Sequence, residues 1–413
     1  MPKIKDVIAK EVLDSNKTPT LEVRIILDNR ISGTAAVPSG ASKGEREALE
    51  LRDNDPRRYN GKGVLKAVNN VNAIIKPKLI GHEVTDQTGI DKLMIALDGT
   101  QNKSKLGANS IVGVSMAIAR CAANAQGLPL FHYLRKISGL TLNEYAIPVP
   151  MMVMIEGGKH GRGNNLSIQE FCVIGEVEDG KNVWQELKKI LKSQGQETLM
   201  GLEGGFAPKI SSHEEALDFL TTAIADADLR PGKDIRIGMD VAASEIFKDG
   251  KYTLEDQPMS TEELIHHLND LVEKYEIYSI EDGLSQNDWK GWKMLRKLLG
   301  DKLKIIGDDI FVTNPDLIKK GEKENVANAV LIKPNQIGTI TETLRAAKIT
   351  IDGGWDLVVS HRSGETLDTF IADLAVAVNA LMLKTGAPSL PERNIKYERL
   401  EEIDKRLSLE MSQ

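Results

Sequence analysis

The spacing of hydrophobic and polar positions along the chain changes near residue 145. From there onward, short β-branched runs each end in a polar residue and are followed by a stretch with helical spacing. Successive closing residues lie 41, 27, 25, 28 and 23 positions apart, and the last four separations are typical of one strand–helix unit. Alternating strands and helices predict a parallel sheet. Six such runs close at Asp240, Glu281, Asp308, Lys333, His361 and Lys384.

The length of this region favours a closed (β/α)8 barrel over a doubly wound open sheet. No Gly-x-Gly-x-x-Gly turn follows the first strand, as a dinucleotide-binding sheet would require. In (β/α)8 barrels the reactive residues sit at the C-terminal ends of the strands, which is where the charged residues fall. The fold class we predict is therefore α/β, with a barrel as the larger part.

The first third of the chain has a mixed α+β pattern. Residues 20–27 alternate as a strand does, and a second short strand is expected at 34–37. Helical spacing of apolar residues predicts helices at 45–52, 64–79 and 109–125. The polar, glycine-containing stretch 137–144 predicts a domain boundary. We expect an α+β capping domain over residues 1–138 and the barrel over 139–413.

Composition narrows the function classes. The 413 residues suggest two domains, and 41% hydrophobic residues suffice for a large core. The formal charge of −7 and the 4% aromatic content disfavour a nucleic-acid binder. Two cysteines exclude a disulfide framework and a four-thiolate metal site. The charged start of the chain and the lack of a long apolar segment predict a cytoplasmic protein without a membrane span.

Three carboxylates close three successive predicted strands, and they are Asp240, Glu281 and Asp308. Strand ends converge on the mouth of a barrel, where three anions repel one another unless a cation binds between them. Oxygen ligands without a neighbouring histidine suit a hard ion such as Mg²⁺. The alternative is that each carboxylate caps a helix or pairs with a surface lysine.

Basic residues close the next strands. Lys333 and Lys384 each follow a buried apolar run, where burial and neighbouring cations lower a lysine pKa toward that of a general base. A structural, salt-bridged lysine is the alternative for each. In the loop 360–366, Arg362 and Ser363 are suited to hold a phosphate at a helix N-terminus, although a solvated loop explains the spacing equally well.

Two further candidates lie in glycine-rich segments. Glu203 is followed by glycines that let the backbone approach a ligand closely. His160 lies in the glycine cluster 157–163, which is typical of a loop that closes over a site. An ordinary turn glutamate and a bystander histidine are the alternatives.

At these residues the sequence resembles enolase, the enzyme that interconverts 2-phosphoglycerate and phosphoenolpyruvate, and the resemblance covers nearly the whole chain. Several matching stretches are long and specific to that family. They are 37–42, 47–53, 97–100, 106–109, 169–171, 203–205, 279–282, 307–309, 333–339 and 360–366.

The resemblance implies an α+β N-terminal domain on a C-terminal barrel, and it implies roles for individual residues. Lys333 would remove the C2 proton while Lys384 and metal stabilise the resulting dianion. Glu203, with Glu170 beside it, would protonate the leaving hydroxyl at C3. Two Mg²⁺ ions per active site are expected, the second arriving with substrate. The other implied roles are a first metal site at Asp240, Glu281 and Asp308, a second metal contact at Ser39, phosphate binding at Arg362 and Ser363, and site lining or acid support by Gln169, His160 and His361.

The chain departs from the family pattern near the predicted acid. Where the family has Asp-Glu-Gly-Gly, this chain has Leu202 before Glu203. Where the family has Met-Asn-x-x-Asn-Gly-Gly, this chain has Val153 and Glu156 in place of the two amides. Our hypothesis is that Glu156 pairs with Lys159, Arg162 or a metal.

A second group of departures concerns association. In enolases, two regions meet across the dimer through opposite charges. The corresponding partners here are Glu22 with Glu402 and Lys10 with Lys405, which are like-charged pairs. We expect a homo-oligomer to be possible but its dimer to be weakened or rearranged.

Three functions follow from the sequence. The leading one is a Mg²⁺-dependent phosphopyruvate hydratase acting on a small phosphorylated substrate in glycolysis or gluconeogenesis. The second is an enolase-like protein that has lost most turnover and serves as a binding or structural protein. The third is a related barrel lyase acting on another 2-hydroxy or phosphorylated acid, which the retained Arg362, Ser363 and Ser39 loop argue against.

Overall fold

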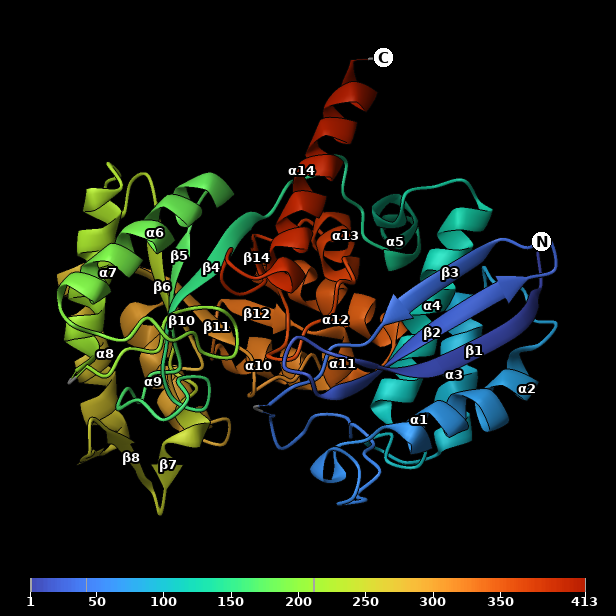
Figure 1. Cartoon of the computed structure of the whole chain (residues 1–413), viewed down its shortest axis with the longest axis horizontal. Helices are drawn as coiled ribbons and strands as arrows, with labels where there is room; N and C mark the ends of the chain where they lie inside the picture. The colour runs from blue at the N-terminus through green and yellow to red at the C-terminus, as the bar shows by residue number, and fades with distance from the viewer. Residues whose placement is uncertain (1, 42, 211, 413) are drawn as a thin grey trace.

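The chain begins with a three-stranded antiparallel sheet, β1–β2–β3 (Figure 1). A computed structural model describes residues 2–41, 43–210 and 212–412. The strands predicted at 20–27 and 34–37 are confirmed. The bounds are Ile4–Leu13 for β1, Pro19–Leu27 for β2 and Ser32–Ala36 for β3.

Helices pack against this sheet and form the rest of the N-terminal domain. The helix predicted at 109–125 is confirmed as α4, which is buried along almost its whole length. The segment 64–79 is also helical, as predicted, but its middle part forms a π turn, η2. There the Lys76 N–H donates to the Val71 carbonyl, five residues back, just before Pro77, which has no N–H. The bounds are Tyr59–Gly61 for η1, Leu65–Asn69 for α1, Asn70–Ile75 for η2, Lys76–Leu79 for α2, Gln87–Asp98 for α3, Ala108–Ala125 for α4 and Leu130–Ser138 for α5.

The predicted helix at 45–52 is wrong, because this segment is irregular. Its backbone N–H groups bond outside the segment instead of to each other. The N–H of Ala48 donates to the Gln336 carbonyl at 2.8 Å, and that of Leu49 donates to the Asn102 carbonyl at 2.7 Å. Tertiary contacts therefore override the local helical pattern.

Eight strands close into a barrel in the order β10-β11-β12-β13-β14-β4-β5-β6, as the sequence predicted. The barrel forms the left half of Figure 1. Its strands are β4 Val149–Glu156, β5 Glu170–Ile174, β6 Arg236–Asp240, β10 Ile277–Glu281, β11 Lys304–Gly307, β12 Ala329–Ile332, β13 Asp356–Ser360 and β14 Met382–Lys384.

Strand β5 corrects the expectation of an all-parallel sheet. It runs antiparallel to both β4 and β6, whereas the other neighbouring strands of the barrel run parallel. The segment 157–169 between β4 and β5 contains no helix, so the chain turns back directly beside β4. The first residue of β5, Glu170, therefore lies at the same end of the barrel as the last residues of the parallel strands.

Helices surround the barrel, and a small three-stranded sheet projects from one side (Figure 1). The helices are α6 Val177–Ser193, α7 His213–Asp226, α8 Thr261–Tyr275, α9 Trp289–Leu299, α10 Pro315–Glu324, α11 Pro334–Ile337, α12 Ile340–Asp352, α13 Phe370–Ala377 and α14 Pro391–Met411. The small sheet has β7 Phe247–Lys248, β8 Lys251–Leu254 and β9 Gln257–Met259, and the turn η3 is Ala243–Glu245. No helix in the described part of the chain is long and apolar enough to cross a membrane.

The side chains inside the barrel form an apolar cluster of their own, apart from the main core, and charged residues follow them toward the barrel mouth. Cys172, Ile306, Leu331 and Met382 belong to this cluster. Side chains two positions apart on a strand share a face, so the residue two positions nearer the mouth also points inward. By this spacing the interior residues place Glu170, Asp308, Lys333 and Lys384 around the mouth.

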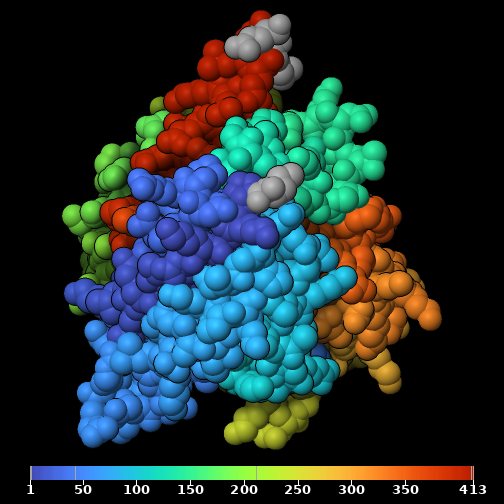
Figure 2. Space-filling model, turned by 90° about the vertical axis from the view of Figure 1, so that its right-hand side faces the viewer, coloured from blue at the N-terminus to red at the C-terminus, as the bar shows by residue number. Residues whose placement is uncertain are grey.

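The N-terminal domain rests on this mouth through main-chain and side-chain bonds. Ser39 and Gly364 exchange two backbone hydrogen bonds of 2.8 Å each. Arg120 of α4 pairs with Asp368 of the barrel at 2.6 Å. Figure 2 shows the N-terminal domain covering much of one face of the molecule, with α14 above it.

Candidate active site

Four carboxylates lie in one row across neighbouring strands of the barrel. Glu156 of β4 is in register with Glu170 of β5, Glu170 with Asp240 of β6, and Asp240 with Glu281 of β10. All four are buried. The convergence predicted for Asp240 and Glu281 is thus present, and the reversed strand β5 brings Glu170 into the same row.

Lys384 lies at the centre of this row. Its Nζ is 2.6 Å from Glu281, 2.8 Å from Glu170 and 3.3 Å from Asp240. Burial alone would lower the pKa of Lys384, but Glu170 and the other two carboxylates outweigh it and hold that pKa well above its usual range. Burial raises the pKa of Asp240 and Glu281, while Lys384 opposes the rise. The lysine is therefore charged and holds the carboxylates together.

Lys333 and Asp308 form a second ion pair in the cavity, with Nζ 2.5 Å from Oδ2. Gln336 donates to the other oxygen of Asp308 at 2.7 Å. Burial acts against the charged form of Lys333, yet Asp308 raises the pKa of this lysine above its usual value. The sequence predicted that burial and nearby cations would lower the lysine pKa, and this direction is wrong because carboxylates are the dominant neighbours of Lys333 and Lys384.

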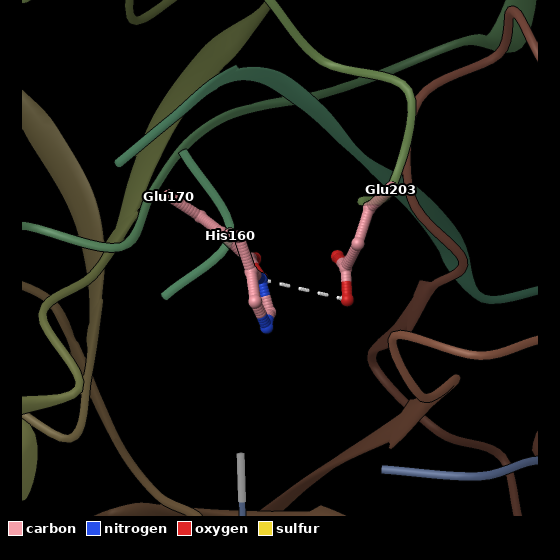
Figure 3. Close-up of side chains that lie close together, drawn as sticks. All are labelled: His160, Glu170 and Glu203. Carbon is pink, nitrogen blue, oxygen red and sulfur yellow. Dashed lines mark hydrogen bonds and ion pairs between the residues drawn. The ribbon is translucent and has the colours of Figure 1, made fainter. Parts of the chain in front are cut away.

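His160, Glu170 and Glu203 form a third cluster, drawn in Figure 3. His160 Nδ1 is 3.1 Å from Glu170 and 3.7 Å from Glu203, which approaches from a different loop. Burial disfavours the imidazolium, but Glu203 and Glu170 raise the pKa of His160 to about 9. Its Nε2 is buried and has no hydrogen-bond partner among the described residues. The raised pKa favours the imidazolium form of His160, in which both ring nitrogens donate.

His361 lies beside the other carboxylate oxygen of Glu203 than the one that His160 faces. His361 Nε2 is 3.2 Å from Glu203 Oε2. Nδ1 contacts the guanidinium of the buried Arg393, which can only donate, so Nδ1 accepts and Nε2 carries the hydrogen toward Glu203. Burial lowers the pKa of His361 and raises that of Glu203, but His361 and His160 hold the pKa of Glu203 well below its usual range.

Arg362 and Ser363 lie where the N-terminal domain meets the barrel. Arg362 contacts both carboxylate oxygens of Glu47, at 3.0 and 3.1 Å, and the Asn335 side chain at 3.1 Å. Ser363 Oγ accepts a hydrogen bond from the Ala41 N–H at 2.7 Å. Both residues line the cavity and present donors of the kind that bind a phosphate.

One cavity at the barrel mouth is lined by nearly all of the predicted site residues. It is lined by His160, Gln169, Glu170, Glu203, Asp240, Asp308, Lys333, His361, Arg362, Ser363 and Lys384. Glu281 lies behind this lining and pairs with Lys384. Ser39 does not line it, because its hydroxyl donates to Asp14 instead. The metal contact expected of Ser39 stays a prediction.

Carboxylate oxygens in the cavity fit a hard divalent cation. Asp282, Asp308 and Asp309 present oxygens within 4.8 Å of one another, as do the ligand atoms of His160, Glu170 and Glu203. The second set already has positive partners within it or beside it, since Lys384 pairs with Glu170 and the pKa of His160, 3.7 Å from Glu203, is raised to about 9. Asp240 and Asp308 line the cavity and Glu281 lies behind it, and all three contact the ammonium group of Lys333 or Lys384. Such buried oxygen donors suit Mg²⁺.

Sequence reasoning missed two of these carboxylates. Burial and Asp308 raise the pKa of Asp309 to about 8, and burial with Asp309 raises that of Asp282 well above its usual range. Asp282 accepts the N–H groups of Asp308 and Asp309 at 2.9 Å each. Both residues directly follow a predicted ligand in the sequence, which is the signal that could have revealed them.

Pairing of Glu156 with Lys159 or Arg162 is wrong, while its pairing with a metal stays a hypothesis. Lys159 pairs with Glu245 at 2.6 Å, and Arg162 is exposed. The Glu156 carboxylate instead accepts main-chain N–H groups of Glu203 and Gly205. Burial and then Glu203 raise the pKa of Glu156 to about 8.

The fold and the cavity define a two-domain barrel protein with an acid–base site where the barrel strands end. Residues 144–412 match the family described as the enolase C-terminal TIM barrel domain, and residues 4–134 match the enolase N-terminal domain. The chain belongs to the enolase family. This family assignment supports a lyase of the enolase superfamily, and the division at residue 138 stays a prediction.

Proposed function

We propose that the protein interconverts 2-phosphoglycerate and phosphoenolpyruvate as a Mg²⁺-dependent phosphopyruvate hydratase. The observation that carries the proposal is the composition of one cavity. It combines two buried lysines, a histidine–glutamate pair and an arginine–serine pair suited to phosphate. Dehydration needs each of these groups, because a proton must leave C2, a hydroxide must leave C3 and an anionic substrate must be held.

Lys333 is the base in this proposal. Its neutral form takes the proton from C2, and the electron pair of that bond forms the C2–C3 double bond. Beside Asp308 the lysine is protonated, which is the form that returns a proton to C2 in the hydration direction. Lys384 stays charged among its carboxylates and stabilises the anionic carboxylate that develops.

Glu203 and His160 form the acid side. The leaving hydroxyl at C3 takes a proton and departs as water. Glu203 is ionised in this structure, so the proton that it delivers is stored on His160, whose Nδ1 lies 3.7 Å away. His361 Nε2 faces Glu203 Oε2 at 3.2 Å and would support this carboxylate as the proton moves. The substrate phosphate is held by Arg362 and Ser363, with Glu47 displaced from Arg362 as the phosphate binds.

Asp240, Glu281 and Asp308 would hold a Mg²⁺ ion in this proposal, with Asp282 and Asp309 close by. When bound, the ion supplies positive charge to the substrate carboxylate and so favours loss of the C2 proton. A second ion is expected with substrate.

The test is phosphoenolpyruvate formation from 2-phosphoglycerate with Mg²⁺, using Lys333→Ala as the control variant. We expect Mg²⁺-dependent turnover by the wild-type protein and none by the variant. A wild-type signal no greater than that of Lys333→Ala would overturn the proposal and would leave the binding-protein alternative standing.

A further inference from the structure

Glu156 is a fully buried carboxylate that ends strand β4 but does not line the cavity. It faces the loop 201–205, which carries Glu203. Its Oε1 and Oε2 lie 3.1 and 3.0 Å from the Glu203 N–H, and Oε1 lies 2.8 Å from the Gly205 N–H. A single side chain thus contacts the backbone on both sides of residue 204.

We propose that Glu156 is the positioning residue of the acid side, and that its carboxylate clamps the backbone of 203–205 so that the Glu203 side chain points at His160. The catalytic half of this inference rests on the proposed function. The clamp itself rests on the contacts alone.

Carbonyl groups of the loop also accept hydrogen bonds from outside it. The Glu203 carbonyl accepts from the Ala387 N–H at 3.0 Å, and the Gly204 carbonyl accepts from Trp184 Nε1 at 3.2 Å. Within the described residues, Glu156 is the acceptor for the N–H groups of Glu203 and Gly205. Without an acceptor, two buried N–H groups would be left unpaired, and the loop would adopt another conformation to satisfy them.

The glycines of the loop make room for this carboxylate. A Cβ at Gly201 would lie 2.5 Å from the Glu156 carboxyl carbon, and a Cβ at Gly205 would lie 3.2 Å from its Cγ. Gly204 has a backbone φ of +90°, which residues with a side chain rarely adopt. The backbone therefore wraps closely around Glu156, which fixes the direction in which residue 203 projects.

The two departures from the family pattern at this place compensate each other in charge. Leu202 removes a carboxylate beside Glu203, and Glu156 supplies one from the neighbouring strand. Above its own pKa of about 8, Glu156 carries a negative charge that adds to those of Glu203 and Glu170 in favouring the protonated form of His160. The clamp thus acts on both members of the acid pair.

The test compares Glu156→Gln with a matched control, Glu178→Gln, which removes one exposed carboxylate on α6. Both oxygens of Glu156 face main-chain N–H groups, so in either orientation the glutamine NH₂ sets donor against donor and forces the loop away from it. We expect about tenfold faster amide hydrogen exchange at 203 and 205 in Glu156→Gln and no change in Glu178→Gln. Exchange is measured without substrate, so it reports on the clamp even if the proposed function fails.

Kinetics then test the catalytic half. We expect kcat to fall about tenfold in Glu156→Gln while KM changes less than about twofold, because the acid acts in the transition state. The alkaline limb of the kcat profile should also move to lower pH, since His160 loses a favourable negative charge.

Wild-type exchange rates in Glu156→Gln would overturn the clamp, and unchanged kcat with faster exchange would overturn its catalytic role. If Glu156→Gln does not fold, Glu156→Asp replaces it, because the shorter carboxylate lengthens the same contacts and must also speed exchange.

Discussion

At the scale of single residues, the site works through opposed charges in a buried space. Burial alone would neutralise Glu203 and His160, yet each holds the other in its charged form at 3.7 Å. The same balance holds for Lys384 among its carboxylates. Each member therefore depends on its partners, and removal of one changes the protonation state of the others.

The pH dependence of turnover follows from His160. Its pKa in the folded protein is raised to about 9, so the imidazolium persists at neutral pH and is lost as the pH rises through that value. Glu170, Glu203 and Glu156 are the charged groups that face it. We expect kcat for dehydration to decline above about pH 9. A profile whose alkaline limb stays in place in His160→Gln would contradict this assignment.

Arg393 gives a second prediction at this scale. Its guanidinium is fully buried, fixes the His361 tautomer and donates to the carbonyls of Arg362 and Ser363 at 2.6 and 2.7 Å. A lysine cannot supply this fork of donors. We expect Arg393→Lys to lower kcat by about tenfold or more, measured under saturating substrate. Retention of the wild-type kcat would show that the tautomer is fixed in another way.

At the scale of elements, the position of each strand decides which residues reach the cavity. The apolar runs that each end in a polar residue could be read from the sequence, so Asp240, Glu281, Asp308, Lys333 and Lys384 were predicted as strand ends. The reversal of β5 was not predicted, because no local pattern distinguishes an antiparallel strand from a parallel one. The irregular segment 45–52 was also missed, since its N–H partners lie far away in the sequence. The lysine pKa directions failed for the same reason, because they depend on which side chains the fold brings together.

Helix α4 provides a stability prediction for an element. It packs on the sheet of the N-terminal domain, and Ile111 on it is 0% exposed. We expect Ile111→Ala to lower the free energy of unfolding by about 2–5 kcal/mol, because the lost contacts leave a cavity. Ile74→Ala, at a position 39% exposed, is the control and should cost less than about 0.5 kcal/mol. Denaturant titration of both variants measures the difference, and equal effects would refute the packing argument.

At the scale of the whole molecule, association remains a prediction from charge. Lys10 pairs with Glu22 at 2.8 Å within the chain, and Glu402 pairs with Arg399 at 2.8 Å. Both pairs lie within the chain, so the acidic side chains Glu22 and Glu402 already have basic partners before any second copy approaches. We propose that this dimer is weakened or rearranged.

Sedimentation at low micromolar protein concentration tests the prediction. We expect weak association of the wild-type chain and tighter association of the double variant Glu402→Arg/Lys405→Glu, which creates opposite charges facing Glu22 and Lys10. A tight wild-type dimer that the double variant does not strengthen would contradict the charge argument.

The central claim is that one cavity separates a base, Lys333, from an acid side built on Glu203. Deuterium incorporation at C2 of 2-phosphoglycerate in D₂O with Mg²⁺ tests it most directly, because exchange needs only the base. We predict that Glu203→Gln exchanges the C2 hydrogen but forms little phosphoenolpyruvate, whereas Lys333→Ala does neither. Exchange at the wild-type rate by Lys333→Ala, or no exchange by the wild-type protein, would contradict the claim.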